Sequence, residues 1–426
     1  MARRALRAGE RAALRRVVGA YFAYQTFGSV NFFWPVFVVF YQRYGRLDLP
    51  AIFELQAFFT LSRVVLDVPL GLAADRFGRR LALIASAALT AIGCGVIVAW
   101  PSLVAFYLAE LCFASSVAAK SGADSALLYD ALSEHGQVDD YPRVEGRAQS
   151  LAALAAATSA IASGLLLEWW LPLPYLMTLS AACATVMSAV LIDEPVRVTS
   201  SASWRGIARG ALREIVASRA AMWVIALYAL LVVLSHVVFY LQQPYLEAIG
   251  VPVALFGVVF AASKLVHAMA ASRAARVEAL VPPARMPAVL LAAALSPIAL
   301  MGAIASPLGA LVVPLRGVAD GLLQPVVNFY LNRLVSPFRR ASVLSIASFA
   351  ARLLQVVVLW AFGMALARMS ASATLRLAAV LGALASAALL WLPHGGRAPA
   401  AARPAPVGDR GRATLDGARD DPAARD

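Results

Sequence analysis

The sequence predicts an all-α polytopic membrane protein with twelve transmembrane helices, arranged as two pseudo-symmetric halves of six helices each. Composition is the first observation behind this prediction: the 426-residue chain is 61% hydrophobic and only 14% charged, with a mean hydropathy of +0.74. Second, most of the chain divides into apolar segments of about 20 residues, the length that spans a bilayer. Third, short motifs of the first half recur in the same order in the second half.

A basic N-terminus, residues 1–16, precedes the first half, residues 17–193. The first apolar segment is too long for the core of a signal peptide and is followed by further spans, so we expect it to remain as a helix. Each segment of this half is long enough to cross about 30 Å of hydrocarbon. The six predicted helices cover about residues 17–41, 51–72, 81–99, 102–132, 150–167 and 171–192.

A linker over residues 194–221 separates the halves. Apolar residues recur at helical spacing between Trp204 and Ile215, which predicts an amphipathic helix on the membrane surface. After the second half, residues 222–393, the tail 394–426 is rich in Ala, Pro, Arg and Asp and is predicted to be disordered. The six helices of the second half cover about residues 222–246, 253–271, 287–305, 307–331, 342–366 and 373–392.

Arginine placement predicts the topology. Arginines are concentrated in the N-terminus and in alternate loops, whereas the opposite loops hold little beyond Arg43, Arg46, Arg368 and Arg376. By the positive-inside rule the arginine-rich side is cytoplasmic, so both termini are expected on the cytoplasmic side of a bacterial-type inner membrane. The formal charge of +13 therefore reflects topology. It does not indicate nucleic-acid binding, because no basic soluble face interleaved with aromatic residues accompanies it.

Motifs of enzymes and cofactor sites are absent from the sequence. Cys94, Cys112 and Cys183 lie inside apolar segments without Cys-x-x-Cys spacing, which argues against a disulfide framework or a zinc site. No Gly-x-x-x-x-Gly-Lys, His-Glu-x-x-His or Gly-x-Ser-x-Gly run occurs, and the four histidines are scattered. We therefore predict no metal, no cofactor and no enzymatic activity.

The most specific motif, Gly71-Leu72-Ala73-Ala74-Asp75-Arg76-Phe77-Gly78-Arg79-Arg80, lies between the second and third segments. An ionic side chain at the centre of a membrane helix costs about 2.5–3.5 kcal/mol on insertion scales, so this turn should lie at a membrane surface. Its spacing, Gly-x-x-x-Asp-Arg-x-Gly-Arg-Arg, resembles the cytoplasmic loop signature of the major facilitator superfamily of secondary transporters. The alternative interpretation is an ordinary basic turn.

The resemblance implies a function as well as a fold. It implies alternating access between two six-helix halves, in a secondary transporter that moves a small organic molecule across the cytoplasmic membrane. We expect proton coupling, a monomer, and export in preference to uptake. An uptake permease of the same fold and a transport-inactive membrane receptor or sensor are the alternatives. The expected partners are the substrate, protons and the lipid bilayer.

The resemblance also implies a gate at the loop motif. Asp75 should face the start of segment eleven, near residues 340–342, where free backbone N–H groups attract an anion. Arg79 should pair with Asp130 at the inner end of segment four. The expected gating residues are Gly71, Asp75, Arg76, Gly78, Arg79, Arg80 and Asp130.

An internal repeat carries charges inside the spans. Lys120-Ser121-Gly122-Ala123-Asp124 in segment four matches Arg316-Gly317-Val318-Ala319-Asp320 in segment ten, and both read base-x-x-Ala-Asp. A base and an acid four residues apart share a helix face, so we expect an intramembrane ion pair in each, and another between Arg63 and Asp67. The chain has only two lysines, Lys120 and Lys264, and both lie within spans. Structural ion pairs without contact to substrate are the alternative.

In the resembling family the first, fourth, seventh and tenth helices line a central cavity. Asp124 and Asp320 are the expected proton carriers, because burial favours the protonated form of a carboxyl group while a neighbouring base opposes it. His267 is expected to be a packing residue. The predicted cavity wall consists of Asn31, Trp34, Glu110, Lys120, Asp124, His236, Gln243, Arg316, Asp320 and Asn328.

Overall fold

The computed structural model describes residues 2–194, 212, 213, 215–323, 327 and 340–392, and all regular secondary structure in this part of the chain is helical. Most of the predicted linker helix and the whole predicted disordered tail lie outside the described residues. The elements of the first half are α1 (Ala2–Ser29), α2 (Phe37–Arg43), α3 (Leu49–Phe77), α4 (Arg79–Ala99), α5 (Leu103–Lys120), α6 (Ala123–Glu134), the short 3-10 helix η1 (Val138–Asp140), α7 (Tyr141–Trp169) and α8 (Leu173–Val190).

The second half is likewise built of helices joined by short turns, several of them 3-10. Its described elements are α10 (Arg219–Ala248), η2 (Val253–Leu255), α11 (Phe256–Ser272), α12 (Ala274–Leu280), α13 (Met286–Ala303), η3 (Pro307–Leu311), η4 (Val313–Leu315), a helical stretch over 316–323, α15 (Arg340–Leu366) and α16 (Ala371–Trp391).

Ten helices of the described residues are long and apolar enough to cross a membrane. The other two predicted spans are the first and the tenth. The first is divided into α1 and α2 by a turn over residues 30–36, which includes Pro35. The tenth begins with η3 and η4 and continues as the 316–323 helix, beyond which most residues lie outside the described part.

Segment four is one candidate span over Leu103–Glu134, as expected over residues 102–132, but a break divides it into two helices. Helix α5 ends at Lys120 and α6 begins at Ala123. Between them Gly122 has a φ of +76°, in the left-handed region that glycine adopts without a steric penalty. The sequence predicted a continuous apolar run because periodicity does not reveal a single left-handed residue.

Polar side chains cap the first turns of several membrane helices. Asp48 accepts a hydrogen bond from Ala51 N at the start of α3, and Ser102 accepts one from Ala105 N at the start of α5. At the start of α4, Glu194 accepts hydrogen bonds from the backbone N–H groups of Arg79 and Arg80, at 3.0 and 2.8 Å. These carboxylate and hydroxyl oxygens satisfy helix N–H groups that have no partner within the helix.

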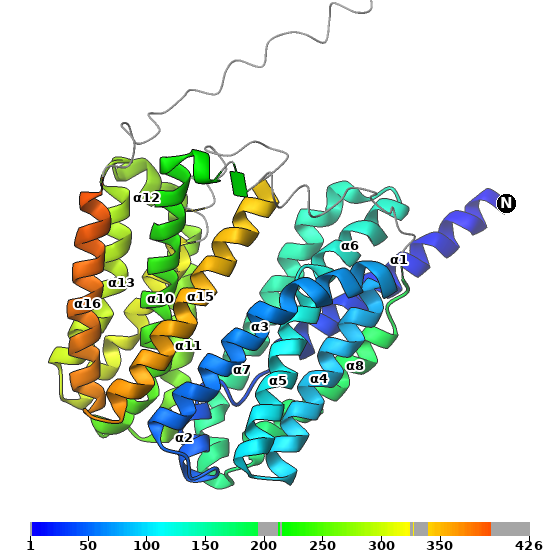
Figure 1. Cartoon of the computed structure of the whole chain (residues 1–426). Helices are drawn as coiled ribbons and strands as arrows, with labels where there is room; N and C mark the ends of the chain where they lie inside the picture. The colour runs from blue at the N-terminus through cyan, green and yellow to red at the C-terminus, as the bar shows by residue number, and fades with distance from the viewer. Residues whose placement is uncertain (1, 195–211, 214, 324–326, 328–339, 393–426) are drawn as a thin grey trace, which may run out of the picture.

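The two halves form neighbouring helical bundles (Figure 1). They touch on the side of the molecule that holds α2, which we name the closed side. There a Cβ atom at Gly257 of α11 would overlap the backbone oxygen of Ala160 in α7, and one at Gly164 would overlap that of Val253. These glycines allow the two backbones to approach closely, as small residues do at membrane helix interfaces.

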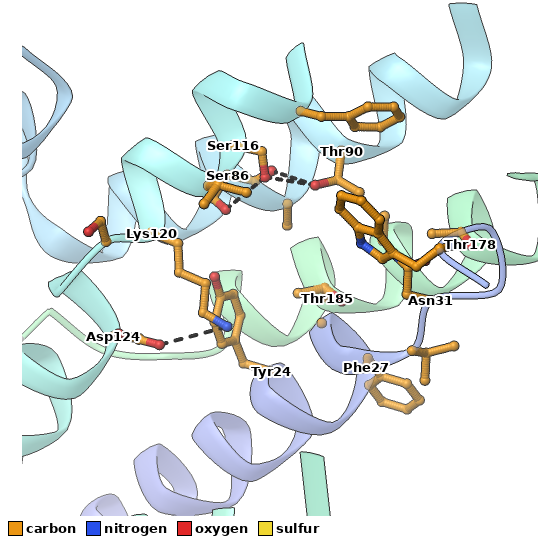
Figure 2. A pocket seen from close by; sticks show the side chains of 18 of the residues that line it. Tyr24, Phe27, Asn31, Ser86, Thr90, Ser116, Lys120, Asp124, Thr178 and Thr185 are labelled. Atoms are coloured by element: carbon orange, nitrogen blue, oxygen red, sulfur yellow. Dashed lines mark hydrogen bonds and ion pairs between the residues drawn. The ribbon is translucent and has the colours of Figure 1, made fainter. Parts of the chain in front are cut away.

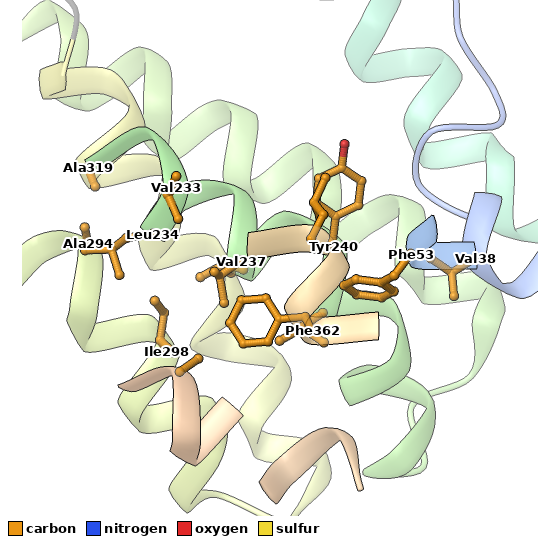
Figure 3. Close-up of a cluster of buried hydrophobic side chains, with 14 of the residues drawn as sticks. Val38, Phe53, Val233, Leu234, Val237, Tyr240, Ala294, Ile298, Ala319 and Phe362 are labelled. Atoms are coloured by element: carbon orange, nitrogen blue, oxygen red, sulfur yellow. The ribbon is translucent and has the colours of Figure 1, made fainter. Parts of the chain in front are cut away.

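Buried side chains of both halves form one apolar cluster, which joins the halves near the closed side and continues through the second half. In Figure 3, Val38 and Phe53 of the first half lie beside Tyr240 and Phe362 of the second. Arg43 and Glu247 form an ion pair between the halves on the same side, at 3.4 Å. Toward the opposite side, which holds the N-terminus and α6, the helices of the two bundles diverge in Figure 1. We name this second side the N-terminal side.

Candidate functional site

Two adjoining cavities lie between the helices. The first cavity, about 430 Å³, is formed by helices of the first half, and the second, about 700 Å³, lies between the halves. Pockets of several hundred Å³ hold small organic molecules. The two cavities share lining residues from α1, α3, α5 and the turn after α1, namely Gly28, Asn31, Trp34, Phe59, Arg63 and Val117.

The base–acid pair of the first half lies at one end of the first cavity (Figure 2). The Lys120 Nζ atom is 3.7 Å from Asp124 Oδ2, and it donates a shorter hydrogen bond, 3.0 Å, to Gln25 Oε1. Gln25 in turn donates to the same Asp124 oxygen, at 3.0 Å. Lys120 also lies over the Tyr24 ring, 5.3 Å from its centroid. The lysine is therefore held by a neutral amide and an aromatic ring as well as by its carboxylate.

Neutral hydroxyl groups line another part of the first cavity. Ser116 lies between Ser86 and Thr90, at 3.1 and 2.7 Å between hydroxyl oxygens, as Figure 2 shows. Thr178 and Thr185 of α8 line the same cavity. Hydroxyl groups donate and accept hydrogen bonds equally well, so this part of the wall can bind neutral polar groups of a ligand.

The base–acid pair of the second half lines the second cavity. Arg316 Nε donates to Asp320 Oδ2 at 3.0 Å, and Ser235 Oγ donates to the other oxygen of the same carboxylate. The Arg316 side chain is only 9% exposed, against 32% for Lys120. The base of the second pair is therefore the more deeply buried of the two, whereas the acids are similarly exposed, 20% for Asp320 and 17% for Asp124, and each carboxylate has donors on both oxygens.

Two glycines position this second pair. A Cβ atom at Gly317 would overlap the Ser263 backbone oxygen of α11, and one at Gly321 would overlap that of His267. The Gly-x-x-x-Gly spacing gives the 316–323 helix a smooth face on which α11 lies close. As a result Lys264 and His267 of α11 line the same cavity as Arg316 and Asp320.

Aromatic rings separate the charged parts of the wall. Trp34 contacts Phe59 and Phe239, with ring centroids 6.4 and 5.5 Å away. The Arg316 guanidinium lies 5.0 Å from the centroid of Phe239, and Lys264 Nζ lies 5.5 Å from that of Phe260. Cations over ring faces are attracted by the ring quadrupole, and the rings also provide apolar surface for a ligand.

Asp67 joins the halves through an ion pair that the sequence did not predict. Its expected partner, Arg63, lies 3.9 Å from Asp67 Oδ1. The closer partner is Arg352 of α15, which donates to Asp67 Oδ2 across the interface between the halves. The expected i,i+4 pair is therefore one edge of a three-residue cluster, because helix packing brings a second arginine to the same carboxylate.

The structure distributes the other predicted wall residues over two regions. Asn31, Trp34 and His236 line the cavities together with the two base–acid pairs. Asn31 Oδ1 accepts a hydrogen bond from Trp34 N, at 3.0 Å, which stabilises the turn after α1. Asn328 lies outside the described residues. His267, expected to be a packing residue, is exposed and lines the second cavity, because the Gly317–Gly321 face leaves it beside Asp320.

Two predicted wall residues border neither cavity. Glu110 is 4% exposed and accepts hydrogen bonds from Tyr41 Oη and Gln56 Nε2, both at 2.8 Å. Gln243 accepts one from Val38 N at 2.9 Å and donates one to the Trp34 backbone oxygen at 3.1 Å. Both side chains point into packed helix contacts on the closed side. They belong to the helices expected to line the cavity but not to the faces of those helices that do so.

The loop motif lies on the N-terminal side. Gly78, with φ +124°, separates α3 from α4, and Arg79 forms an ion pair with Asp130, its expected partner. Arg80 donates to the Val190 backbone oxygen at 2.6 Å. Gly71, Asp75 and Arg76 belong to the last two turns of α3. The side chains of 340–342 lie outside the described residues, and in Figure 1 the start of α15 lies apart from the end of α3.

Sequence reasoning missed several cavity residues. Arg352 and Gln355 of α15 line the second cavity, as do Thr60 of α3 and the aromatic residues Phe239 and Phe260. A charged residue within a predicted span is itself a signal of a functional site, and Arg352 carried that signal. The aromatic residues carried none, since an apolar ring in a membrane helix is as compatible with lipid as with a cavity.

A family model and several solved structures match this chain. The family model of the Major Facilitator Superfamily matches residues 18–359. No curated protein matches the sequence.

Among solved structures, the chain is similar to the nucleoside transporter NupG, with a TM-score of 0.72 and 12% identity over 89% of this chain and 98% of that one. It is similar to a bacterial homologue of the human lysosomal transporter Spinster, in an inward-facing and unoccupied conformation, with a TM-score of 0.66 and 14% identity over 89% and 96%. It is also similar to a D-xylose–proton symporter, with a TM-score of 0.62 and 16% identity over 91% and 98%. At these identities the likeness shows the fold alone.

Proposed function

The chain belongs to the major facilitator superfamily of secondary transporters, and from this premise we propose that it moves a small organic molecule by alternating access and couples that movement to protons. The observation that carries the proposal is the second cavity, which is walled by both halves and contains base–acid chemistry. A site between two bundles can be exposed to either side of a membrane when one bundle rocks against the other. Because one chain supplies both halves of the site, we propose that the monomer is the transporting unit.

The orientation follows from the distribution of arginine. We propose that the N-terminal side is cytoplasmic and that the protein lies in the cytoplasmic membrane of a bacterial-type cell, with both termini inside. The halves touch on the closed side through Gly164, Gly257 and the Arg43–Glu247 pair. With this orientation the structure corresponds to an inward-facing conformation. The Asp75 gate at the cytoplasmic end would then be open, and it would close against the start of α15 in the outward-facing conformation.

Proton coupling is proposed to use Asp124 and Asp320. Each carboxylate has one base a helical turn away, at 3.7 Å for Lys120 and 3.0 Å for Arg316. A substrate that takes the base removes the charge that keeps the carboxylate ionised, so the carboxyl group then binds a proton. Re-formation of the ion pair on the other side of the cycle releases that proton. Asp124 is the first candidate, because a lysine is a single point charge and is displaced more easily than a forked guanidinium.

The direction of transport depends on whether substrate and proton occupy the cavity together or in turn. The sequence prediction of export requires that they alternate, so that a proton moves inward as the substrate moves outward. Uptake is the second candidate, and the coupling step described above for Lys120–Asp124 and Arg316–Asp320 favours it. A substrate that takes Arg316 leaves Asp320 to bind a proton at the same time, so both would move in one direction. Accumulation against extrusion in oriented proteoliposomes distinguishes the two.

The proposal is tested by neutralising the two carboxylates. In proteoliposomes, Asp124→Asn and Asp320→Asn should lose accumulation driven by an imposed pH gradient and retain counterflow exchange of substrate, which needs reorientation of the cavity but no net proton movement. Asp139→Asn, an exposed carboxylate in η1, is the matched control and should behave as the parent protein. Gradient-driven accumulation in both cavity variants would refute the coupling assignment and direct attention to Glu110 or Asp67.

A further inference from the structure

The charges that face the two cavities do not balance. Five bases line them, namely Arg63, Lys120, Lys264, Arg316 and Arg352, whereas Asp124 and Asp320 are the lining carboxylates. Even when Asp67, which pairs with Arg352, is added to the acids, five bases face three carboxylates and two positive charges remain in excess. Two histidines, His236 and His267, also line the second cavity and add ring nitrogens that can form hydrogen bonds. An excess of like charge around a cavity within membrane-spanning helices is costly unless a counter-charge joins it.

Donor groups of these bases remain unused, which locates the excess in the second cavity. The Nη1 atom of Arg316 is buried and has no hydrogen-bond partner, although Nε of the same side chain is bonded to Asp320. The Nε atom of Arg63 is likewise buried and without a hydrogen-bond partner, since the nearest carboxylate oxygen, Asp67 Oδ1, lies 3.9 Å away. Lys264 forms no ion pair among the described residues, and its contact there is with the Phe260 ring. Lys120 and Arg352, in contrast, are each bonded to oxygen acceptors.

The three bases with spare donors come from three elements and both halves. Gly317 and Gly321 hold the 316–323 helix against α11, which places Arg316 and Lys264 on neighbouring walls of the second cavity. Arg63 of α3 lines the same cavity from the first half. A ligand bound by all three would connect the two halves, as the substrate of an alternating-access transporter does.

Apolar rings surround this group of bases. Trp34, Phe59, Phe239 and Phe260 line the second cavity and lie within contact distance of one another or of the bases. The rings provide surface for an apolar or aromatic body, and the guanidinium and ammonium groups provide donors for anionic oxygen atoms.

Given a transporter as proposed above, we propose that its substrate is an amphipathic organic anion. The anionic group, a carboxylate or a phosphate, binds Arg316, Lys264 and Arg63, and the apolar body lies against Trp34, Phe59 and Phe239. The guanidinium of Arg316 donates hydrogen bonds to this anion in place of Asp320, and its buried, unpartnered Nη1 shows that its donors are not all satisfied by the protein. The substrate thereby competes with Asp320 for the same base, which links binding of the anion to protonation of the carboxylate.

The test uses the purified full-length protein and one matched set of probes. Indole-3-acetate, indole-3-acetamide and tryptamine carry the same ring with an anionic, a neutral and a cationic group, and phenyl phosphate provides the phosphate arm. Thermal unfolding is followed at increasing concentrations of each, since a ligand that binds only the folded state raises the unfolding temperature. Indole-3-acetate or phenyl phosphate should raise it, and which of them does so assigns the anionic group.

Three results would overturn the inference: stabilisation by tryptamine equal to or greater than that by the acids, equal stabilisation by acid and amide, or no stabilisation by either anion up to its solubility limit. Lys264→Gln, an exposed side chain at the cavity, should lower the affinity for the stabilising anion at least about tenfold, the loss of one charge-assisted contact. Arg316→Gln should lower it further if the variant folds. Arg143→Gln, on the surface and 85% exposed, should leave it unchanged.

Binding and transport can fail separately in these experiments. Anion binding without proton-driven movement in proteoliposomes would refute the proposed transport function and leave the ligand class intact. Proton-driven movement of a neutral or cationic compound, with no anion binding, would refute the ligand class and leave the transport function intact.

Discussion

The two base–acid pairs occupy equivalent places in the two halves and differ in backbone geometry, in separation and in the burial of the base. In the first half the pair spans a helix break, the base and acid are 3.7 Å apart, and Gln25 contacts both. In the second half the pair lies within one helical stretch at 3.0 Å, and Ser235 donates to the acid. The base of the first pair is 32% exposed and that of the second 9%. A repeated sequence has therefore produced one loose pair and one tight pair.

A glycine in each repeat explains the difference. In Lys120-Ser121-Gly122-Ala123-Asp124 the glycine adopts a left-handed conformation with no atom near its would-be Cβ, so it ends α5 and lets the acid start a new helix. In Arg316-Gly317-Val318-Ala319-Asp320 the glycine stays helical and lies against the backbone of α11. The same residue type gives conformational freedom in one half and close packing in the other. The first pair is accordingly suited to opening during a cycle, and the second to firm contact with a ligand.

Removal of the base should separate the two pairs most strongly. Arg316→Gln removes a base that is only 9% exposed from its carboxylate, and loss of one partner of a buried pair typically costs about 3–5 kcal/mol. Lys120→Gln should cost about 1 kcal/mol or less, because the lysine is partly exposed and Gln25 still donates to Asp124. Thermal unfolding of the two variants in one detergent, without ligand, measures the difference. Equal losses of stability would remove the asymmetry.

Replacement of the glycines should give a smaller contrast. Gly317→Ala places a methyl group against the Ser263 carbonyl and should cost about 1–3 kcal/mol by forcing α11 away. Gly122→Ala meets no atom within 4 Å. Its left-handed backbone should nevertheless cost about 1–2 kcal/mol.

The clearer readout of the glycine variants is ligand binding. Displacement of α11 carries Lys264 with it, so Gly317→Ala should weaken stabilisation by the anionic probe, whereas Gly122→Ala should not. Weakening by both variants would indicate that the two cavities bind the ligand as one site.

Loss of the neutral partners should have the smallest effect. Ser235→Ala removes one hydrogen bond from Asp320 while Arg316 remains, and should lower the rate of proton-driven transport roughly two- to tenfold, the equivalent of about 0.5–1.5 kcal/mol. Gln25→Leu removes contacts to both members of the looser pair and should lower it more. Transport rates measured at equal protein insertion test this order, and a larger effect of Ser235→Ala would reverse the assignment of loose and tight pairs.

Local sequence features predicted much of this protein. Apolar segment lengths gave the membrane class and most helices, because a helix rise of about 1.5 Å per residue and a fixed bilayer thickness leave little choice. The four-residue spacing predicted both the Lys120–Asp124 and the Arg316–Asp320 contacts, although only the second pair meets within one helical stretch and the first meets across the break at Gly122. The loop motif indicated the superfamily that the family model matches over residues 18–359.

Only the tertiary structure decided which charges and rings meet across helices distant in sequence. Arg352 lies 285 residues from Asp67 and became its partner because α3 and α15 pack together. The side chains of Glu110 and Gln243 form hydrogen bonds within packed helix contacts, whereas His267 lines the second cavity. The sequence of an apolar membrane helix does not distinguish the face that meets lipid from the faces that meet another helix or a cavity. Which of them meets lipid, another helix or a cavity is set by close approaches such as those at Gly257 and Gly317, where the absence of a side chain acts only once the neighbouring backbone is in place.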